Sequence, residues 1–246
     1  MIPFSDLSRA AFCPRQLYYT RREDDRSIPP KSRTRIDLAF RYPELVSAPD
    51  RELRRLPIRR SPAAYRRNLS RLRERDDYGA LVDPDRERAF VSGRDCHGTV
   101  RKVLRPDAGS DVEEDDRAEA VEGVETNPET DAETNTEPPV PVVVSPGEPP
   151  ETGVWEPQSV RAVAVAKALA WEHEREVPRA LVEYPAVGVV REVRLTVRRT
   201  ATYRRALRTV RGIDGPPPRV DDDRCEACSY REECGTRTRS LRTLLG

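Results

Sequence analysis

The chain has 246 residues, of which 36% are hydrophobic and 35% are charged, and its formal net charge is +1. This length fits one large domain or two small ones, and the apolar share allows a core when the charges lie on surfaces or in a disordered segment. No stretch is long and apolar enough for a membrane helix, and the first residues lack the charged and apolar regions of a secretory signal. We therefore expect a cytoplasmic protein with no membrane partner, in a reducing compartment.

The first 22 residues predict two short helices separated by a break at Cys13 and Pro14. Ser5 is a candidate N-cap of the first helix, and Pro14 fits the first turn of the second, which should continue to Arg22. Residues 23–34 are polar and contain prolines, so we expect a loop there.

An arginine-rich helix is predicted to begin after Ser61, which can cap its N-terminus. Apolar Tyr65, Leu69 and Leu72 follow at helical spacing and form one face. The basic residues on its other faces include three candidates for nucleic-acid binding: Arg66, Arg67 and Arg71. The pattern fits a solvated surface and a phosphate-binding surface equally well.

Three strands are predicted next, at 89–91, 97–105 and 140–144, and an acidic insert separates the last two. The insert, residues 107–139, holds thirteen acidic residues and one basic residue. Without it the chain has 43 basic and 30 acidic residues, a formal charge of +13. The insert has too few large apolar side chains to form a core, so we expect it to be disordered, with the two flanking strands pairing as hairpin neighbours.

The C-terminal half predicts a helix from Pro157 to about Glu176, two strands and a second helix. The first helix should carry an apolar stripe that includes Val160, Ala164, Ala168 and Trp171. The strands are expected at 181–184 and 189–197, joined by a turn at 185–188, and the second helix at 200–211.

Five cysteines in a reducing compartment favour metal binding over disulfides. Cys225, Cys228 and Cys234 form a C-x2-C-x5-C motif that can hold one ion or one cluster. A set of four thiolates then needs Cys13 or Cys96 as well. Structural zinc and iron–sulfur clusters both accept four cysteines, so spacing alone does not choose between them.

The sequence Cys13-Pro14-Arg15, followed by Tyr18-Tyr19 and paired with the C-terminal cysteine motif, resembles the CRISPR-associated RecB-like exonucleases of the PD-(D/E)XK nuclease superfamily. The resemblance implies an α/β, restriction-endonuclease-like core with a central mixed sheet flanked by helices. It implies one domain, formed by residues 1–106 and 140–246. It also implies a [4Fe–4S] cluster that joins the chain ends through four ligands: Cys13, Cys225, Cys228 and Cys234.

The same resemblance locates a nuclease site that this chain has lost. In the family an Asp, a Glu and a Lys on two strands bind Mg²⁺ or Mn²⁺ and assist the reaction, and a Gln and a Tyr follow on a helix. The matching positions here hold Arg101, Val143, Ser145, Arg161 and Val165. These residues supply no carboxylate, and Arg101 is a candidate for gripping nucleic acid instead.

We therefore expect a catalytically degenerate protein of this family that binds a [4Fe–4S] cluster and nucleic acid, most simply DNA. Partners in CRISPR adaptation or DNA repair are expected from the resemblance. One alternative is an active exonuclease that uses Mg²⁺ or Mn²⁺ through other residues. A second alternative is an interaction protein that the cluster stabilises and that does not bind DNA.

Overall fold

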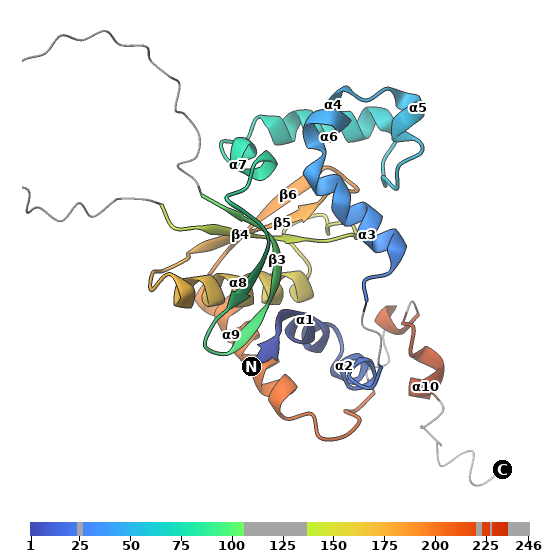
Figure 1. Ribbon diagram of the computed structural model, residues 1–246. Coiled ribbons are helices and arrows are strands. Elements are labelled where there is room, and N and C mark those ends of the chain that lie inside the picture. The colour runs from blue at the N-terminus through green and yellow to red at the C-terminus, as the bar shows by residue number, and fades with distance from the viewer. Residues whose placement is uncertain (24–26, 106–136, 220–222, 227, 236–246) are drawn as a thin grey trace, which may run out of the picture.

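The computed structural model describes residues 1–23, 27–105, 137–219, 223–226 and 228–235 of the chain. These residues form an α/β protein with a mixed β-sheet between two layers of helices (Figure 1), which confirms this part of the predicted fold. Almost all of the acidic insert, predicted to be disordered, lies outside the described residues. Within the described part of the chain, no helix combines the length and the hydropathy needed to cross a membrane.

The sheet combines parallel and antiparallel neighbours in the spatial order β1-β3-β4-β5-β6, with β2 also paired to β3. The strands are β1 (Ile2–Pro3), β2 (Arg86–Ser92), β3 (Cys96–Leu104), β4 (Val140–Val144), β5 (Arg179–Tyr184) and β6 (Val189–Arg194). Strands β3 and β4 pair antiparallel, with Lys102 opposite Val142, so the strands on either side of the acidic insert are neighbours as predicted. Strand β5 runs parallel to β4, and the chain between them forms a helix that crosses the sheet.

Helices cover both faces of the sheet. The first layer contains α1 (Phe4–Phe12), α8 (Glu156–Glu172) and α9 (Val197–Arg211). The second contains α3 (Pro30–Asp37), the 3-10 helix η1 (Leu38–Phe40), α4 (Tyr42–Ser47), α5 (Asp50–Leu53), α6 (Pro62–Arg73) and α7 (Tyr78–Val82). Three further short elements lie where the chain ends meet: α2 (Pro14–Thr20), η2 (Asp223–Cys225) and α10 (Arg231–Gly235).

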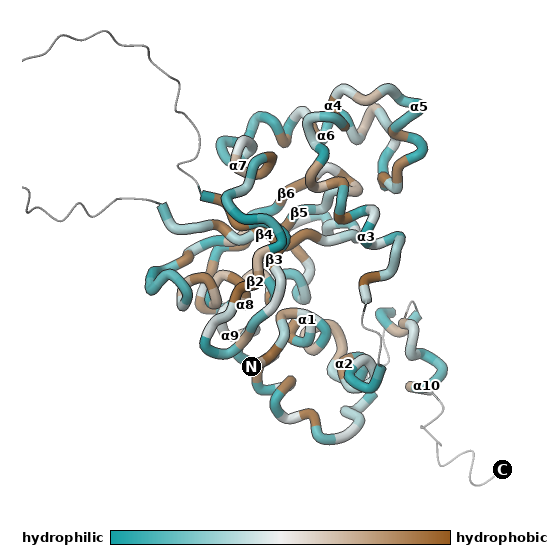
Figure 2. The backbone as a smooth tube through the Cα atoms, in the orientation of Figure 1, coloured by the Kyte–Doolittle hydropathy of each residue, from teal (hydrophilic) through white to brown (hydrophobic). Residues whose placement is uncertain are grey.

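Alternating side chains of the central strands fill two separate cores. Val143 and Val182 pack under α8 in the first layer, whereas Val142 and Leu181 pack under the second layer. Helix α8 lies close to the end of β2, where Gly93 follows the strand. A Cβ atom at Gly93 would lie 2.5 Å from the Cα of Ala168, so the close approach needs a glycine there. Figure 2 shows hydrophobic segments along the strands and α8 at the centre of the molecule.

The predicted arginine-rich helix is confirmed as α6. The Ser61 hydroxyl accepts a hydrogen bond of 3.3 Å from the amide of Ala64, and Tyr65, Leu69 and Leu72 are buried. Gly188, with a φ of +72°, closes the predicted turn between β5 and β6 directly over this face.

Several predicted boundaries were wrong. Helix α1 begins at Phe4 with Pro3 before it, so Ser5 is not its cap. Helix α3 starts at Pro30, inside the predicted loop, because proline suits the first turn of a helix. Helix α8 ends at Glu172, shortly before Glu174 at φ +51°, and Trp171 is exposed rather than part of the apolar stripe.

The boundary between β6 and α9 also differs from the prediction. The strand ends at Arg194, and the helix already begins at Val197, which is 90% exposed. Thr196 explains the early start, because its hydroxyl accepts a hydrogen bond of 3.3 Å from the amide of Arg199 and so caps the helix.

Candidate metal centre and nucleic-acid interface

The two ends of the described chain meet at α2 and the C-terminal segment (Figure 1). The rings of Tyr19 and Tyr230 stack with centroids 5.6 Å apart, and Tyr18 joins them in a small buried cluster. Thr20 and Tyr230 share a hydrogen bond of 3.0 Å between their hydroxyls. The tyrosine pair that accompanies the first cysteine therefore holds the C-terminal segment against the N-terminal helices.

Two arginines reinforce this junction through backbone carbonyls. Arg15 is buried and donates a hydrogen bond of 2.7 Å to the carbonyl of Pro217. Arg224 donates one of 2.6 Å to the carbonyl of Phe12. Arg15, the last residue of the Cys-Pro-Arg sequence, thus has a structural role next to the cysteines.

Four cysteines line one small cavity at this junction. Cys13 comes from the break between α1 and α2, and the other three come from the C-terminal segment: Cys225, Cys228 and Cys234. Gln16 approaches this set, with its amide nitrogen 4.0 Å from the Sγ of Cys228. Arginine side chains also line the cavity, and cations beside thiolates offset their negative charge. The four cysteines from the two ends of the chain are therefore neighbours in the fold.

The four thiols share a cavity without converging on one point. Among the residues that the structure describes, no three His, Cys, Asp or Glu side chains gather as they would around one metal ion. A tetrahedral zinc ion with Zn–S bonds of about 2.3 Å needs such a convergence. The choice between zinc and an iron–sulfur cluster therefore still depends on the family resemblance.

Cys96 lies elsewhere, in the core beneath α8. Its thiol is 3.6 Å from the carbonyl of Ala164 and 3.5 Å from the hydroxyl of Tyr203, and burial raises its pKa. Cys96 is therefore a packing residue of the core and lies apart from the other four cysteines. The neighbouring His97 is partly exposed and lies against the ring of Phe90, with centroids 5.8 Å apart.

The five positions that the family resemblance assigns to a nuclease site lie on β3, β4, α8 and the residue after β4. Val143 and Val165 are buried in the core between the sheet and α8. Ser145 follows β4, and its hydroxyl accepts hydrogen bonds from the amide of Gly147 at 3.3 Å and from Gln158 at 3.4 Å. None of these three side chains can replace a metal-binding carboxylate.

The other two positions, Arg101 and Arg161, form an arginine cluster with Arg9 of α1. Burial and the charges of Arg101 and Arg9 lower the pKa of Arg161 to about 10, so it stays charged at neutral pH. Arg161 also donates a hydrogen bond of 3.5 Å to the carbonyl of Thr99. Within the described residues, no carboxylate forms an ion pair with any of the three.

A carboxylate and a lysine do meet inside the protein, but on the opposite face of the sheet. The Nζ of Lys102 is 3.1 Å from Glu183 and donates to the carbonyls of Ala39 and Leu81 at 2.7 Å each. The Tyr42 hydroxyl donates to Glu183 at 3.4 Å. Both charged side chains are 0% exposed, and burial raises the pKa of Glu183. Because the ammonium group of Lys102 already partners the Glu183 carboxylate, we assign the pair a structural role.

The other buried carboxylate of the described chain is Asp6, and it also has a basic partner. Its Oδ2 accepts a hydrogen bond of 3.0 Å from Arg21. Both buried carboxylates therefore serve internal ion pairs. Sequence analysis missed the Lys102–Glu183 pair, although a single acid within the apolar strand Leu181–Tyr184 was a signal for a buried partner.

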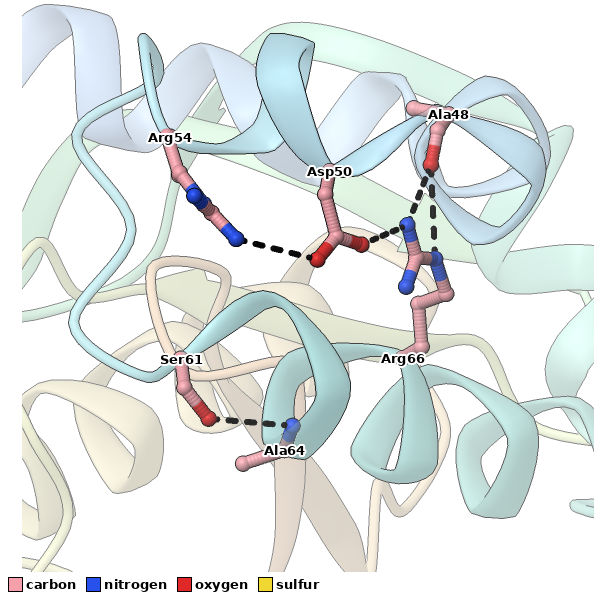
Figure 3. Close-up of polar contacts among 6 residues, drawn as sticks. All are labelled: Ala48, Asp50, Arg54, Ser61, Ala64 and Arg66. Atoms are coloured by element: carbon pink, nitrogen blue, oxygen red, sulfur yellow. Dashed lines mark hydrogen bonds and ion pairs between the residues drawn. The ribbon is translucent and has the colours of Figure 1, made fainter.

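The three candidate arginines of α6 differ in their contacts, and Figure 3 shows those of Arg66. Arg66 bonds the carbonyl of Ala48 at 2.8 Å and Asp50 at 2.5 Å, and the bond from Arg66 is the main cause of the lowered pKa of Asp50. Arg66 thus binds the neighbouring α4–α5 connection, whereas Arg67 and Arg71 are exposed. All three lie on the second layer, across the sheet from the arginine cluster, so α6 and Arg101 do not form one continuous surface.

A scan against protein-family models and a search of curated proteins found no match for this chain. The resemblance to the CRISPR-associated nucleases therefore rests on the sequence motifs alone.

Proposed function

We propose that this protein is a catalytically degenerate relative of the CRISPR-associated RecB-like exonucleases, with a PD-(D/E)XK core. Cys13, Cys225, Cys228 and Cys234 bind a [4Fe–4S] cluster that joins the chain ends, and the basic body binds nucleic acid. The observation that carries the proposal is the position of the four cysteines, which come from the two ends of the chain and line one cavity.

The loss of catalysis is supported by the residues around the matched positions. Mg²⁺ and Mn²⁺ need oxygen ligands, and the matched positions provide two valines, a serine and two arginines. The buried carboxylates of the described chain are already paired with Arg21 and Lys102. An arginine cluster repels a divalent cation and attracts a phosphate, so this face suits binding better than cleavage.

Anaerobic purification tests the cluster. We expect brown protein with about four irons, as a four-cysteine [4Fe–4S] centre requires. Cys13→Ser should lose the iron and the visible absorbance. Cys96→Ser is the matched control and should keep both, because Cys96 lies in the core beneath α8. Stoichiometric zinc in colourless protein would contradict the cluster.

A nuclease assay separates the proposal from the active-exonuclease alternative. Single-stranded and double-stranded DNA are incubated with the cluster-loaded protein and Mg²⁺ or Mn²⁺. We expect intact DNA. Degradation that disappears when a carboxylate of this chain is replaced would establish the alternative.

Binding measured at increasing salt separates the proposal from the second alternative, an interaction protein that does not bind DNA. Affinity for nucleic acid should fall steeply with salt, because each neutralised phosphate releases counterions. No binding at low salt would favour the interaction protein.

A further inference from the structure

A small cavity lies between α6 and the start of β6, across the sheet from the arginine cluster. Its volume is about 250 Å³, and three arginines line it: Arg71 and Arg75 from α6, and Arg191 from β6. Cavities that hold drug-sized ligands span about 300–1,000 Å³, so this one suits a small ligand.

The walls of the cavity are joined by contacts between α6 and the turn that precedes β6. The amide nitrogen of Asn68 donates a hydrogen bond of 2.8 Å to the carbonyl of Val187. Gly188 follows with a φ of +72°, and a Cβ atom there would lie 3.0 Å from the side chain of Leu69. The turn therefore approaches the helix closely, and the three arginines extend from a fixed frame.

The three arginines differ in what neutralises their charges. Arg75 donates hydrogen bonds of 2.7 and 2.8 Å to the two carboxylate oxygens of Asp77, so its charge is balanced within the protein. Among the residues that the structure describes, neither Arg71 nor Arg191 forms an ion pair with a carboxylate. Two positive charges therefore remain uncompensated at the cavity.

Arg191 also has hydrogen-bonding capacity that the protein leaves unused. Its Nη2 makes a long contact of 3.5 Å with the carbonyl of Glu151. Its Nε is buried and lacks a hydrogen-bond partner within the described part of the chain. The neighbouring carboxylate, that of Glu192, accepts a hydrogen bond of 2.6 Å from Arg194 instead. Because a buried donor without an acceptor costs free energy, a ligand oxygen that pairs with this guanidinium would stabilise the complex.

We propose that this cavity binds a phosphate dianion, either free phosphate or the phosphate group of a monoester. Guanidinium groups donate paired hydrogen bonds to phosphate oxygens. Two uncompensated arginines match the charge of about −1.5 to −2 that a phosphomonoester carries at pH 7, whereas a phosphodiester carries a single negative charge. The inference goes beyond the proposed function, because the lining residues belong neither to the metal centre nor to the arginine cluster.

Calorimetric titration of the full chain, purified anaerobically, tests the proposal with three probes: orthophosphate, methyl phosphate and dimethyl phosphate. The first two form dianions and should bind. Dimethyl phosphate is a monoanionic diester and should bind at least about tenfold more weakly, since it lacks one charge for the second guanidinium. The tighter of the first two probes distinguishes free phosphate from a monoester as the ligand.

Two lining arginines have matched controls on their own elements. Arg71→Gln and Arg191→Gln should each weaken orthophosphate binding about tenfold, because each variant removes charge-assisted hydrogen bonds. Arg67→Gln on α6 and Arg194→Gln on β6 remove the same charge outside the cavity and should leave binding nearly unchanged, because solvent screens exposed charges. Absence of phosphate binding, equal weakening in all four variants, or equally tight binding of dimethyl phosphate would overturn the site.

Discussion

Arg101 and Lys102 are adjacent on β3, yet they belong to two very different environments. Lys102 faces the second helical layer, where Glu183 and two carbonyls surround its ammonium group and no water reaches it. Arg101 lies near Arg161 and Arg9 on the other face, with no carboxylate partner in the described chain. A buried cation that is fully paired cannot be removed without leaving its partner charge uncompensated, whereas cations without a carboxylate partner are available to an external anion.

The largest expected effect on stability comes from removing the cation of the Lys102–Glu183 ion pair. Lys102→Met should lower the free energy of unfolding by about 3–5 kcal/mol, because it leaves the Glu183 carboxylate buried without its cation. Arg101→Met, the adjacent control, should change it by less than about 1 kcal/mol. Chemical denaturation of both variants measures the difference. Equal losses would mean that the two cations do not differ in role.

The penalty of Lys102→Met should also depend on pH. Burial raises the pKa of Glu183, and removing the ammonium group raises it further. A carboxyl whose pKa is higher in the folded than in the unfolded state favours folding at low pH, and that contribution is lost as the pH rises through the folded pKa. Denaturation at pH 5 and pH 8 should therefore show a smaller difference from the wild type at pH 5. A constant difference would argue against a charged Glu183 as its cause.

For the arginine cluster, the expected effect is on nucleic-acid binding. Arg161→Gln should weaken single-stranded DNA binding and lower the salt slope by about 0.7, because one phosphate contact is lost. The free energy of unfolding should stay the same or rise, since the charges of Arg101 and Arg9 already oppose that of Arg161. A clear loss of stability with unchanged binding would make this cluster structural instead.

The smallest effects are expected on α6, where paired and unpaired arginines are neighbours. Arg66→Gln should lower the free energy of unfolding by about 1 kcal/mol, because the bond to the Ala48 carbonyl is lost. Arg67→Gln should leave stability unchanged and should affect nucleic-acid binding only if this helix contributes to it. Denaturation curves and binding at low salt for the two variants test this assignment of roles.

Short-range patterns in the sequence predicted much of the fold. Period-two alternation located β3, a short apolar run located β4, and helical spacing with Ser61 located α6, because these signals lie within a few residues of one another. Helix ends were less predictable, because each depends on a single residue. The Thr196 hydroxyl caps the start of α9, and the positive φ of Glu174 follows the end of α8. Three of the predicted metal ligands came from the C-x2-C-x5-C spacing, whereas Cys13 was chosen over Cys96 only by the family resemblance.

The features that sequence analysis missed join distant parts of the chain. Lys102 and Glu183 are 81 residues apart, so neither strand reveals its partner by its own pattern. Arg101 was placed correctly on a strand, but its closeness to Arg9 and Arg161 needed the tertiary structure.

The contact between α2 and the C-terminal segment also determines which parts of the protein can pack only late in synthesis. Gln16 and Cys228 approach each other across 212 residues, so this junction cannot close until almost the whole described chain has been made. At about 5–20 residues per second, the N-terminal partner waits on the order of tens of seconds for the other side. Closure of the junction therefore requires translation through the C-terminal cysteines, and until then Tyr18, Tyr19 and Cys13 lack the neighbours that they have in the folded protein.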